Sequence, residues 1–370
     1  MNQDFYYKLI SGHKKGYIAA FLKTLLAVIA CIYSIIIKLR NLLYNSKIFK
    51  THHHEAIVIS IGNITTGGTG KTPLVIWLYN FLLERNVNCA ILTRGYKAAK
   101  KSNPSRTESR KTNIFNYTDE PAILSESCPR SKVIVNPDRV AGATEAIEKY
   151  AANVLIMDDG FQHRRLARDL DIVTIDATQP FGYDKILPAG LLREPVDSIK
   201  RADAVVLTRC DQTTASELNR IENILQTVNP DMIIAQSAHK VVGAKTTDGK
   251  SINYENLKRR KIFAFCGIGN PNAFLNTITT LGAELAGTKI YNDHYKYTET
   301  CLAEIYRQAG HVEADLILTT QKDWIKIRCL MPQRKDLPLA YLAIEIKLLE
   351  GEDKLRLLID DALTGKILRK

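Results

Sequence analysis

Short apolar runs alternate with amphipathic stretches along most of the chain, beginning near residue 56. The runs are rich in β-branched residues and end at polar or glycine-containing positions, which is typical of buried strands. The strands expected from this pattern are 56–61, 89–93, 132–135, 153–157, 171–175 and 203–208. The helices expected between them lie near 71–85, 138–151 and 214–227. This alternation predicts an α/β fold: a parallel sheet sandwiched by helices.

A second alternating series follows a connector, 236–258, in which mixed short strands are expected before a polar stretch. Its expected strands are 261–268, 285–290, 314–320 and 339–348, and its expected helices are 271–281, 298–310 and 352–363. With 370 residues, the chain is long enough for two domains. We therefore predict one α/β domain over 51–235 and a second, smaller α/β domain over 259–370.

The first fifty residues form a separate region around the apolar run TLLAVIACIYSIII, residues 24–37. Fourteen helical residues reach about 21 Å, and extension back to Ile18 gives about 30 Å, the thickness of a hydrocarbon core. The extension includes Lys23, which could reach toward the interface. A spanning helix, an in-plane interfacial helix and a core helix that covers the sheet all fit this pattern. No small-residue cleavage site follows, so a cleaved signal peptide is the weaker interpretation.

The distribution of charge helps to choose between these interpretations of the apolar segment. The chain carries a formal net charge of +12, and residues 1–50 hold eight basic residues against one acidic residue, Asp4. Basic residues that flank an apolar segment favour an anionic membrane surface, and no RNA-binding or zinc-finger spacing indicates nucleic acid. The seven cysteines are scattered without a Cys-x-x-Cys pair, which fits a reducing cytoplasm. We therefore predict a membrane-associated helix.

The stretch GNITTGGTGKTP, residues 62–73, lies between the first strand and the first helix of the 51–235 domain. Its glycines allow backbone N–H groups to turn toward phosphate oxygens, Lys71 could reach the β and γ phosphates, and Thr72 could bind Mg²⁺. The usual P-loop pattern has glycine where Thr65 stands. A tight strand-to-helix turn is the alternative. The predicted nucleotide-binding residues are Thr65, Thr66, Gly67, Gly68, Thr69, Gly70, Lys71 and Thr72.

Acidic residues follow another expected strand, where Asp158 and Asp159 end the run NVLIM. A carboxylate behind a P-loop can hold Mg²⁺ directly or through water. His163 fits a phosphate donor and an ordinary loop histidine equally well. Asp293 and His294 suit proton transfer, although a helix N-terminal turn gives the same spacing. Ligands of doubly wound sheets bind at the carboxyl ends of the strands, so these residues are candidates for one site.

Nine segments together resemble the tetraacyldisaccharide 4′-kinase family of lipid A biosynthesis. They are GNITTGGTGKTP, TRGY, DEP, NPDRVAG, DDGFQHRRLARDLDIVTID, LPAGLLREP, GIGNPNAF, DHYKYT and TTQKD. They occur in the family's order over about residues 55–325, and the family shares the non-glycine residue at position 65. The resemblance implies ATP-dependent phosphorylation of the 4′-hydroxyl of a tetraacyldisaccharide 1-phosphate at the cytoplasmic face of the bacterial inner membrane.

The resemblance also implies roles for individual residues. Asp119 of DEP would be the catalytic base, paired with His294. The residues implied for ATP and Mg²⁺ are Lys71, Thr72, Asp158, Asp159 and Glu194. The residues implied for phosphate or substrate are Arg139, His163 and Arg193. No protein partner is expected.

Two positions depart from the family pattern: Thr118 stands where glycine often precedes the aspartate, and Gln321 stands where glutamate is frequent. Neither change removes a catalytic group. Two other classes of protein remain as alternatives. One is a membrane-bound GTP switch, because VVLTRCD (205–211) resembles a guanine-reading strand end with Arg209 in place of lysine. The other is a scaffold that binds ATP without catalysis. Acyl-chain preference and oligomeric state do not follow from the sequence.

Overall fold

The computed structural model describes residues 3–95, 119–246, 249–269, 271–292, 295–328, 330 and 337–365. The chain forms two compact units. The first consists of residues 1–94, 128–239 and 346–370, and the second of residues 95–127 and 240–345. Residues 346–370 thus pack with the first unit, whereas the sequence analysis assigned them to the second domain. The domain boundaries drawn from the sequence stay a prediction.

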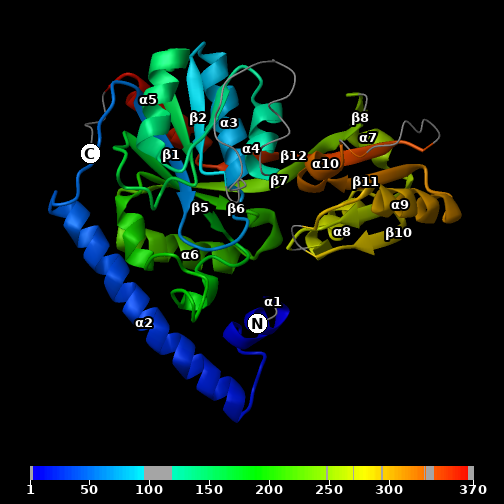
Figure 1. Cartoon of the computed structure of the whole chain (residues 1–370), viewed down its shortest axis with the longest axis horizontal. Helices are drawn as coiled ribbons and strands as arrows, with labels where there is room; N and C mark the ends of the chain where they lie inside the picture. The colour runs from blue at the N-terminus through cyan, green and yellow to red at the C-terminus, as the bar shows by residue number, and fades with distance from the viewer. Residues whose placement is uncertain are drawn as a thin grey trace. The chain divides into compact units, whose positions relative to one another are not determined.

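Two helices precede the sheet of the first unit, α1 (Gln3–Ile10) and α2 (Tyr17–Asn45). Helix α2 is a long rod (Figure 1) and extends well beyond the apolar run on which its prediction rested. Most of its apolar side chains are exposed, and Ala19, Ala30 and Ile37 are its buried residues. Because α2 is so little buried, it is not a core helix that covers the sheet.

The sheet of the first unit is parallel and has the strand order β7-β6-β5-β1-β4-β2-β3 (Figure 1). Its strands are β1 (Ile57–Asn63), β2 (Cys89–Thr93), β3 (Lys132–Val135), β4 (Val154–Asp158), β5 (Leu170–Asp176), β6 (Ala204–Thr208) and β7 (Ile233–Thr246), which continues into the second unit. Strand β1 lies between β4 and β5, with Ile61 opposite Asp158 and Ile172. This register brings the carboxyl ends of three central strands to one edge of the sheet.

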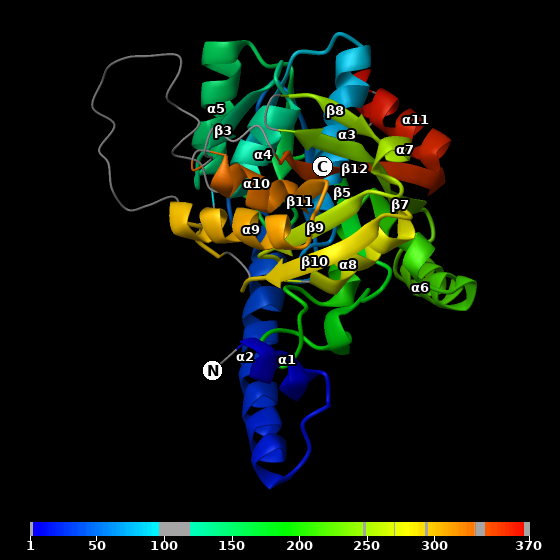
Figure 2. The same cartoon turned by 90° about the vertical axis from the view of Figure 1, so that its right-hand side faces the viewer.

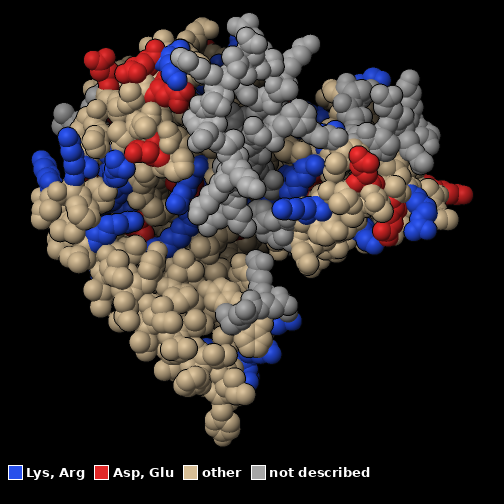
Figure 3. Space-filling model, in the orientation of Figure 1, with Lys and Arg blue, Asp and Glu red and all other residues tan. Residues whose placement is uncertain are grey.

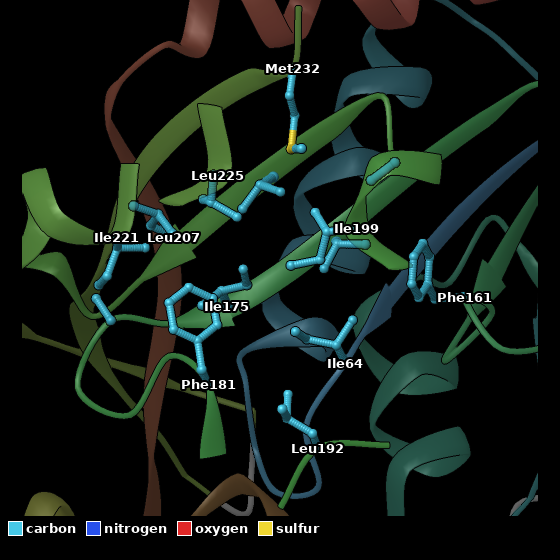
Figure 4. Packing of buried hydrophobic residues seen from close by; sticks show 14 of the residues in the cluster. Ile64, Phe161, Ile175, Phe181, Leu192, Ile199, Leu207, Ile221, Leu225 and Met232 are labelled. Carbon is cyan, nitrogen blue, oxygen red and sulfur yellow. The ribbon is translucent and has the colours of Figure 1, made fainter. Parts of the chain in front are cut away.

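Helices cover both faces of this sheet. The helices of the first unit are α3 (Lys71–Glu84), α5 (Arg139–Tyr150), α6 (Ala215–Val228) and α11 (Glu352–Leu363), with short 3₁₀ turns at Gly182–Asp184, Val196–Arg201 and Cys210–Gln212. Helix α6 packs Ile221 and Leu225 against Ile175 and Leu207 of the strands (Figure 4). Helix α5 covers β2, β3 and β4 on the same face, and α3 lies against β1 and β4 on the opposite face.

The second unit has a smaller parallel sheet of order β10-β9-β11-β12. Its strands are β8 (Ser251–Asn253), β9 (Lys261–Cys266), β10 (Glu284–Ile290), β11 (Leu316–Thr320) and β12 (Leu339–Glu350), and its helices are α4 (Asp119–Ser127), α7 (Tyr254–Leu257), α8 (Pro271–Thr280), α9 (Glu299–His311) and α10 (Gln321–Ile327). Helix α8 packs on one face, and α9 and α10 pack on the other (Figure 2). The fold class predicted from the sequence is confirmed.

Candidate active site

A glycine-rich loop joins β1 to α3 and has the backbone shape that phosphate binding requires. Gly70 caps α3 with φ 82°, in the left-handed region that favours glycine, and Lys71 begins the helix. The N-terminus of α3 therefore opens onto the loop, with unpaired N–H groups and the positive end of the helix dipole. Gly67 and Gly68 are exposed at the tip of the loop. Their lack of side chains leaves the backbone open to an anion.

The loop is braced from outside by neighbouring segments. The Thr66 N–H donates to the Leu191 carbonyl at 2.8 Å, and Thr65 forms an antiparallel bridge with Leu192. On another side, the hydroxyl of Thr69 lies 2.8 Å from that of Thr174. This bracing allows Thr65 to replace the usual glycine, because its backbone is extended and paired with a neighbouring segment.

Two residues at the carboxyl end of β6, Thr208 and Arg209, hold the last part of the loop. The Thr208 hydroxyl donates to the Thr69 carbonyl at 3.1 Å, and the Arg209 guanidinium donates to the Gly68 carbonyl at 3.0 Å. Arg209 also pairs with Asp176 at the end of β5. The carbonyls of Gly68 and Thr69 thus already accept hydrogen bonds from protein side chains.

Three charged side chains meet at the mouth of the loop. The Arg193 guanidinium donates to both carboxylate oxygens of Asp159 at 2.9 Å, and the Lys71 ammonium lies 3.4 Å from Asp159 Oδ1. Burial alone would raise the pKa of Asp159, but Lys71 and Arg193 outweigh it and hold that pKa below its usual value. Asp159 is therefore a carboxylate, and the cluster carries one net positive charge.

Asp158 is buried at the end of β4, next to Asp159. It accepts a hydrogen bond from the Thr93 hydroxyl at 3.1 Å, and its carbonyl accepts one from Arg139 at 3.2 Å. Burial lowers the pKa of Arg139 to about 10, so this side chain is still a cation at neutral pH. The structure thus brings Arg139 to the strand end that carries the two aspartates.

His163 lies in the turn after β4. Its Nε2 atom is buried without a hydrogen-bond partner, and burial together with the charges of Arg139 and Arg168 lowers the pKa of His163 to about 4. The imidazole is therefore neutral at physiological pH. A neutral ring with an unpaired nitrogen can still donate to a phosphate oxygen.

Glu194 is fully buried but is surrounded by protein side chains. Its Oε1 atom lies 2.9 Å from the Arg40 guanidinium, and its Oε2 atom lies 3.1 Å from the Asn41 amide and 3.0 Å from the Arg201 guanidinium. Both oxygens of this candidate metal ligand therefore already have partners. Its metal role stays a prediction.

The candidate base and its partner fall at the limit of the described residues. Asp119 begins α4, but its side chain lies outside the described part, and His294 lies outside it altogether. Their roles stay predictions.

Oxygen donors at the loop suit a small hard cation. The carboxylates of Asp158 and Asp159 and the hydroxyl of Thr72 are the oxygen ligands that Mg²⁺ prefers. Among the described residues, no group of three or more His, Cys, Asp and Glu side chains could hold a metal by itself. Mg²⁺ generally takes one or two carboxylates and completes its shell with water and nucleotide phosphates.

Several residues of the site were not predicted from the sequence. Thr174 and Asp176 lie at or near the carboxyl end of β5. Their place at the end of an expected strand was the signal that could have indicated a role in the site. Arg209 drew notice only as a departure from a guanine-reading motif. Arg40, Asn41 and Arg201 contact the site through Glu194, and no local pattern marks such a distant contact.

A braced glycine-rich loop, a lysine at the start of the following helix and an acidic strand end define a P-loop nucleotide-binding protein. Residues 22–364 match the family model described as tetraacyldisaccharide-1-P 4′-kinase, LpxK. The chain belongs to this family of lipid A kinases, which confirms the resemblance inferred from the sequence motifs.

Individual relatives agree with the family model. The chain is 37% identical over 337 residues to the tetraacyldisaccharide 4′-kinase of Syntrophus aciditrophicus, covering 87% of this chain and 88% of that protein. It is 35% identical over 316 residues to that of Halothermothrix orenii, covering 82% of each chain. The crystal structure of LpxK from Aquifex aeolicus in complex with ATP has a TM-score of 0.72 and 31% identity, covering 92% of this chain and 99% of that one.

Proposed function

We propose that this kinase transfers the γ-phosphate of ATP to the 4′-hydroxyl of a tetraacyldisaccharide 1-phosphate. Within this family, the observation that carries the proposal is the Lys71–Asp159–Arg193 cluster at the mouth of the P-loop. Two cations converge there on one carboxylate beside a helix N-terminus. When a triphosphate enters, both cations can turn from Asp159 to phosphate oxygens, because guanidinium and ammonium groups favour the more highly charged anion.

ATP would bind with its β and γ phosphates on the N–H groups of the loop and on Lys71. Thr72, Asp158 and Asp159 are the proposed ligands of Mg²⁺, which, when bound, would neutralise charge on the phosphate oxygens. Arg139, His163 and Arg193 would contact phosphate oxygens. These roles use cations and neutral donors where negative charge develops during phosphoryl transfer.

Asp119 is the proposed general base. A sugar hydroxyl is a poor nucleophile near neutral pH, so a carboxylate must accept its proton while the new O–P bond forms. The bond between the γ-phosphorus and the bridging oxygen of ADP breaks in the same step. His294 would orient the Asp119 carboxylate and share the proton.

Helix α2 is proposed to bring the enzyme to its lipid substrate. Among the described residues, it is the helix long and apolar enough to cross a membrane, with a mean hydropathy of 2.3 over its most apolar window. Phe21, Ile32 and Ile35 are more than half exposed, and Figure 3 shows this region as a largely uncharged surface with basic groups at its margins. A substrate with four acyl chains stays in the bilayer, at about 0.8 kcal/mol per buried CH₂, so the kinase must work at the bilayer surface.

An in-plane position of α2 is favoured over a spanning one. Residues Tyr33, Arg40 and Asn41 in the C-terminal half of α2 bond to the body of the first unit. The preceding residues 17–32 would reach about 24 Å as a helix, short of a hydrocarbon core of about 30 Å. The cytoplasmic face is proposed because ATP is supplied there, and the described cysteines are all free thiols.

The direct test incubates the full chain with γ-labelled ATP, Mg²⁺ and the disaccharide 1-phosphate in mixed micelles. We expect a labelled 4′-phosphorylated lipid. Asp119→Ala should lower the rate by about 10³-fold or more while ATP still binds, because the nucleotide contacts remain. Full activity of that variant would exclude Asp119 as the base. Hydrolysis of GTP without a lipid acceptor would favour a nucleotide switch, and ATP binding without transfer would favour a scaffold.

A further inference from the structure

The buried carboxylate of Glu194 connects α2 to the rest of the first unit. Two of its partners, Arg40 and Asn41, are neighbours on α2, and the third, Arg201, ends the 3₁₀ turn Val196–Arg201. Burial would raise the pKa of Glu194, but Arg201 and Arg40 outweigh it, so the carboxylate is charged. A charge this deeply buried tolerates few other arrangements of its partners, because a missing partner leaves it uncompensated.

Arg193, the preceding residue, belongs to the phosphate site. Its guanidinium bonds to Asp159, and its N–H donates to the Ile64 carbonyl in the P-loop at 2.6 Å. Two residues earlier, the Leu191 carbonyl accepts the Thr66 N–H. The segment 191–194 therefore contacts the P-loop on one side and α2 on the other.

Helix α2 holds this segment at more than one point. The Tyr33 hydroxyl donates to the Arg193 carbonyl at 3.2 Å. Tyr33 lies on a different side of α2 from the exposed apolar residues. Positions 33, 37, 40 and 41 fall on one side of an α-helix, and Ile37 is buried there. Ile32, Ile35 and Ile36, on the remaining surface of the helix, are more than half exposed. One helix thus presents one face to lipid and another to the phosphate-binding segment.

We infer that Arg40 and Asn41 are positioning residues of the kinase: through Glu194 they fix Arg193, and Arg193 fixes Asp159 and the P-loop. This inference rests on the phosphate site proposed above. The membrane helix is therefore part of the framework of the nucleotide site as well as an anchor. It also explains why Glu194 is buried among cations instead of facing the phosphate loop.

The test compares full-length variants of α2 by the KM for ATP, kcat, the Kd for ATP and binding to vesicles of anionic phospholipid. Arg40→Gln should raise the KM and Kd for ATP about tenfold, the usual size of coupling between connected sites, and leave vesicle binding near that of the control. The matched control is Lys38→Gln, which removes the same charge from an exposed position of the same helix. We expect wild-type kinetics from it.

The double variant Arg40→Gln/Glu194→Gln and the single variant Arg40→Gln together distinguish three possible roles of Glu194. If Glu194 acts through Arg40, removing both charges costs less than the sum of the single changes. If Glu194 is a metal ligand, the double variant is worse than Arg40→Gln and needs more Mg²⁺. If the pair only stabilises the fold, Arg40→Gln lowers the melting temperature without changing the Kd for ATP below that temperature.

Asn41→Ala and Arg40→Lys keep the inference testable if Arg40→Gln does not fold. Asn41→Ala should weaken ATP binding in the same direction, and Arg40→Lys should restore part of the loss. Unchanged ATP affinity in all folded variants, or an equal loss in Lys38→Gln, would overturn the inference. A wild-type protein that phosphorylates no lipid would instead overturn the proposed function, so the two failures are distinguishable.

Discussion

At the scale of single residues, the site depends on how charge is distributed around Asp159. This carboxylate holds Lys71 and Arg193 near the loop, and its own backbone lies in the left-handed region with φ 51°. Non-glycine residues rarely adopt that conformation, and they retain it where surrounding contacts fix it. Asp159 therefore keeps both cations beside the loop, where the proposed function requires cations for the phosphates of ATP.

Among the cations of the candidate site, Lys71 is the one whose removal should lower kinase activity clearly. Lys71→Ala removes the cation that would neutralise the β and γ phosphates, so kcat/KM should fall by about 10²-fold or more. Steady-state kinetics with varied ATP measure this. Lys149→Ala is the control, because it breaks only an exposed pair with Glu145 on α5, worth about 0–1 kcal/mol. A similar loss in both variants would contradict the assignment.

Two half-buried histidines should make stability depend on pH. Burial, together with nearby arginines, lowers the pKa of His163 and of His239 to about 4, from 6.5 in the unfolded chain. The unfolded state therefore binds more protons, so the stabilising contribution is complete above pH 6.5 and is lost as the pH falls toward 4. Urea unfolding at pH 7 and pH 5 should show a lower free energy of unfolding at pH 5.

His239→Asn supplies the comparison for this pH effect. It should reduce the difference between pH 7 and pH 5 by about 1 kcal/mol, after allowance for partial solvent exposure. His311→Asn, which removes an exposed histidine at the end of α9, is the control. An unchanged difference in His239→Asn would show that another group titrates.

At the scale of elements, the P-loop gains its shape from packing as well as from its glycines. Gly62, at the end of β1, faces Phe161 so closely that an added Cβ would lie 2.5 Å from the Phe161 Cβ and 2.6 Å from its backbone nitrogen. Gly68, at the loop tip, has nothing within 4 Å of such a Cβ. Close packing therefore requires a glycine at position 62, whereas packing imposes no such requirement at position 68.

These glycines provide a matched pair of alanine variants. Gly62→Ala should lower the free energy of unfolding by about 1–3 kcal/mol, because β1 or the turn at Phe161 must shift. Gly68→Ala should change it by about 0.5 kcal/mol or less. Chemical denaturation measures both. Equal effects would show that the close approach at Gly62 is not maintained in solution.

The elements also show what the sequence could predict. The apolar runs at β1, β4 and β6 are buried on both faces, so composition alone marked them as strands. Helices α4 and α10 were not expected, because each is short and weakly periodic and begins at a polar cluster. Most of strand β7 was expected as mixed short strands of a connector, although it is one long strand, Ile233–Thr246. Its partly exposed residues lack the continuous apolar signal of a central strand.

For the candidate site, the sequence marked residues that lie next to glycines or strand ends, such as Lys71 and Asp159. It could not show that Glu194 is held by Arg40, because the two are 154 positions apart. Contacts of this length depend on how the whole sheet folds, and no local periodicity encodes them. The motif resemblance supplied the family's roles but not the partners of each side chain.

At the scale of the whole molecule, a long helix with an exposed apolar surface is bonded to the unit that carries the P-loop. Helix α2 supplies an apolar surface on which large side chains are exposed in a row, while its opposite face bonds to the P-loop unit. Monomeric proteins rarely leave such a surface in water. Membrane attachment should therefore depend on these side chains and not on the fold of the catalytic unit.

The variant Ile32→Ser/Ile36→Ser/Leu39→Ser tests this separation. These side chains are between 54% and 56% exposed, so their replacement removes apolar area that would enter lipid without opening a cavity in the core. At about 1 kcal/mol for each half-inserted side chain, partition onto vesicles should fall about 100-fold. Co-sedimentation with vesicles measures this partition.

Leu357→Ser is the control for membrane binding, since Leu357 is a large apolar residue that is 63% exposed on α11, a helix without a long apolar surface. It should leave vesicle binding unchanged. The triple variant should keep a melting temperature close to that of the wild type and bind ATP normally, because Tyr33, Arg40 and Asn41 still connect α2 to the phosphate site. Its activity should fall on substrate in vesicles and be largely retained on substrate dispersed in detergent. Equal loss in both systems would mean that the apolar side chains support the catalytic unit itself, and attachment and catalysis would then not be separable.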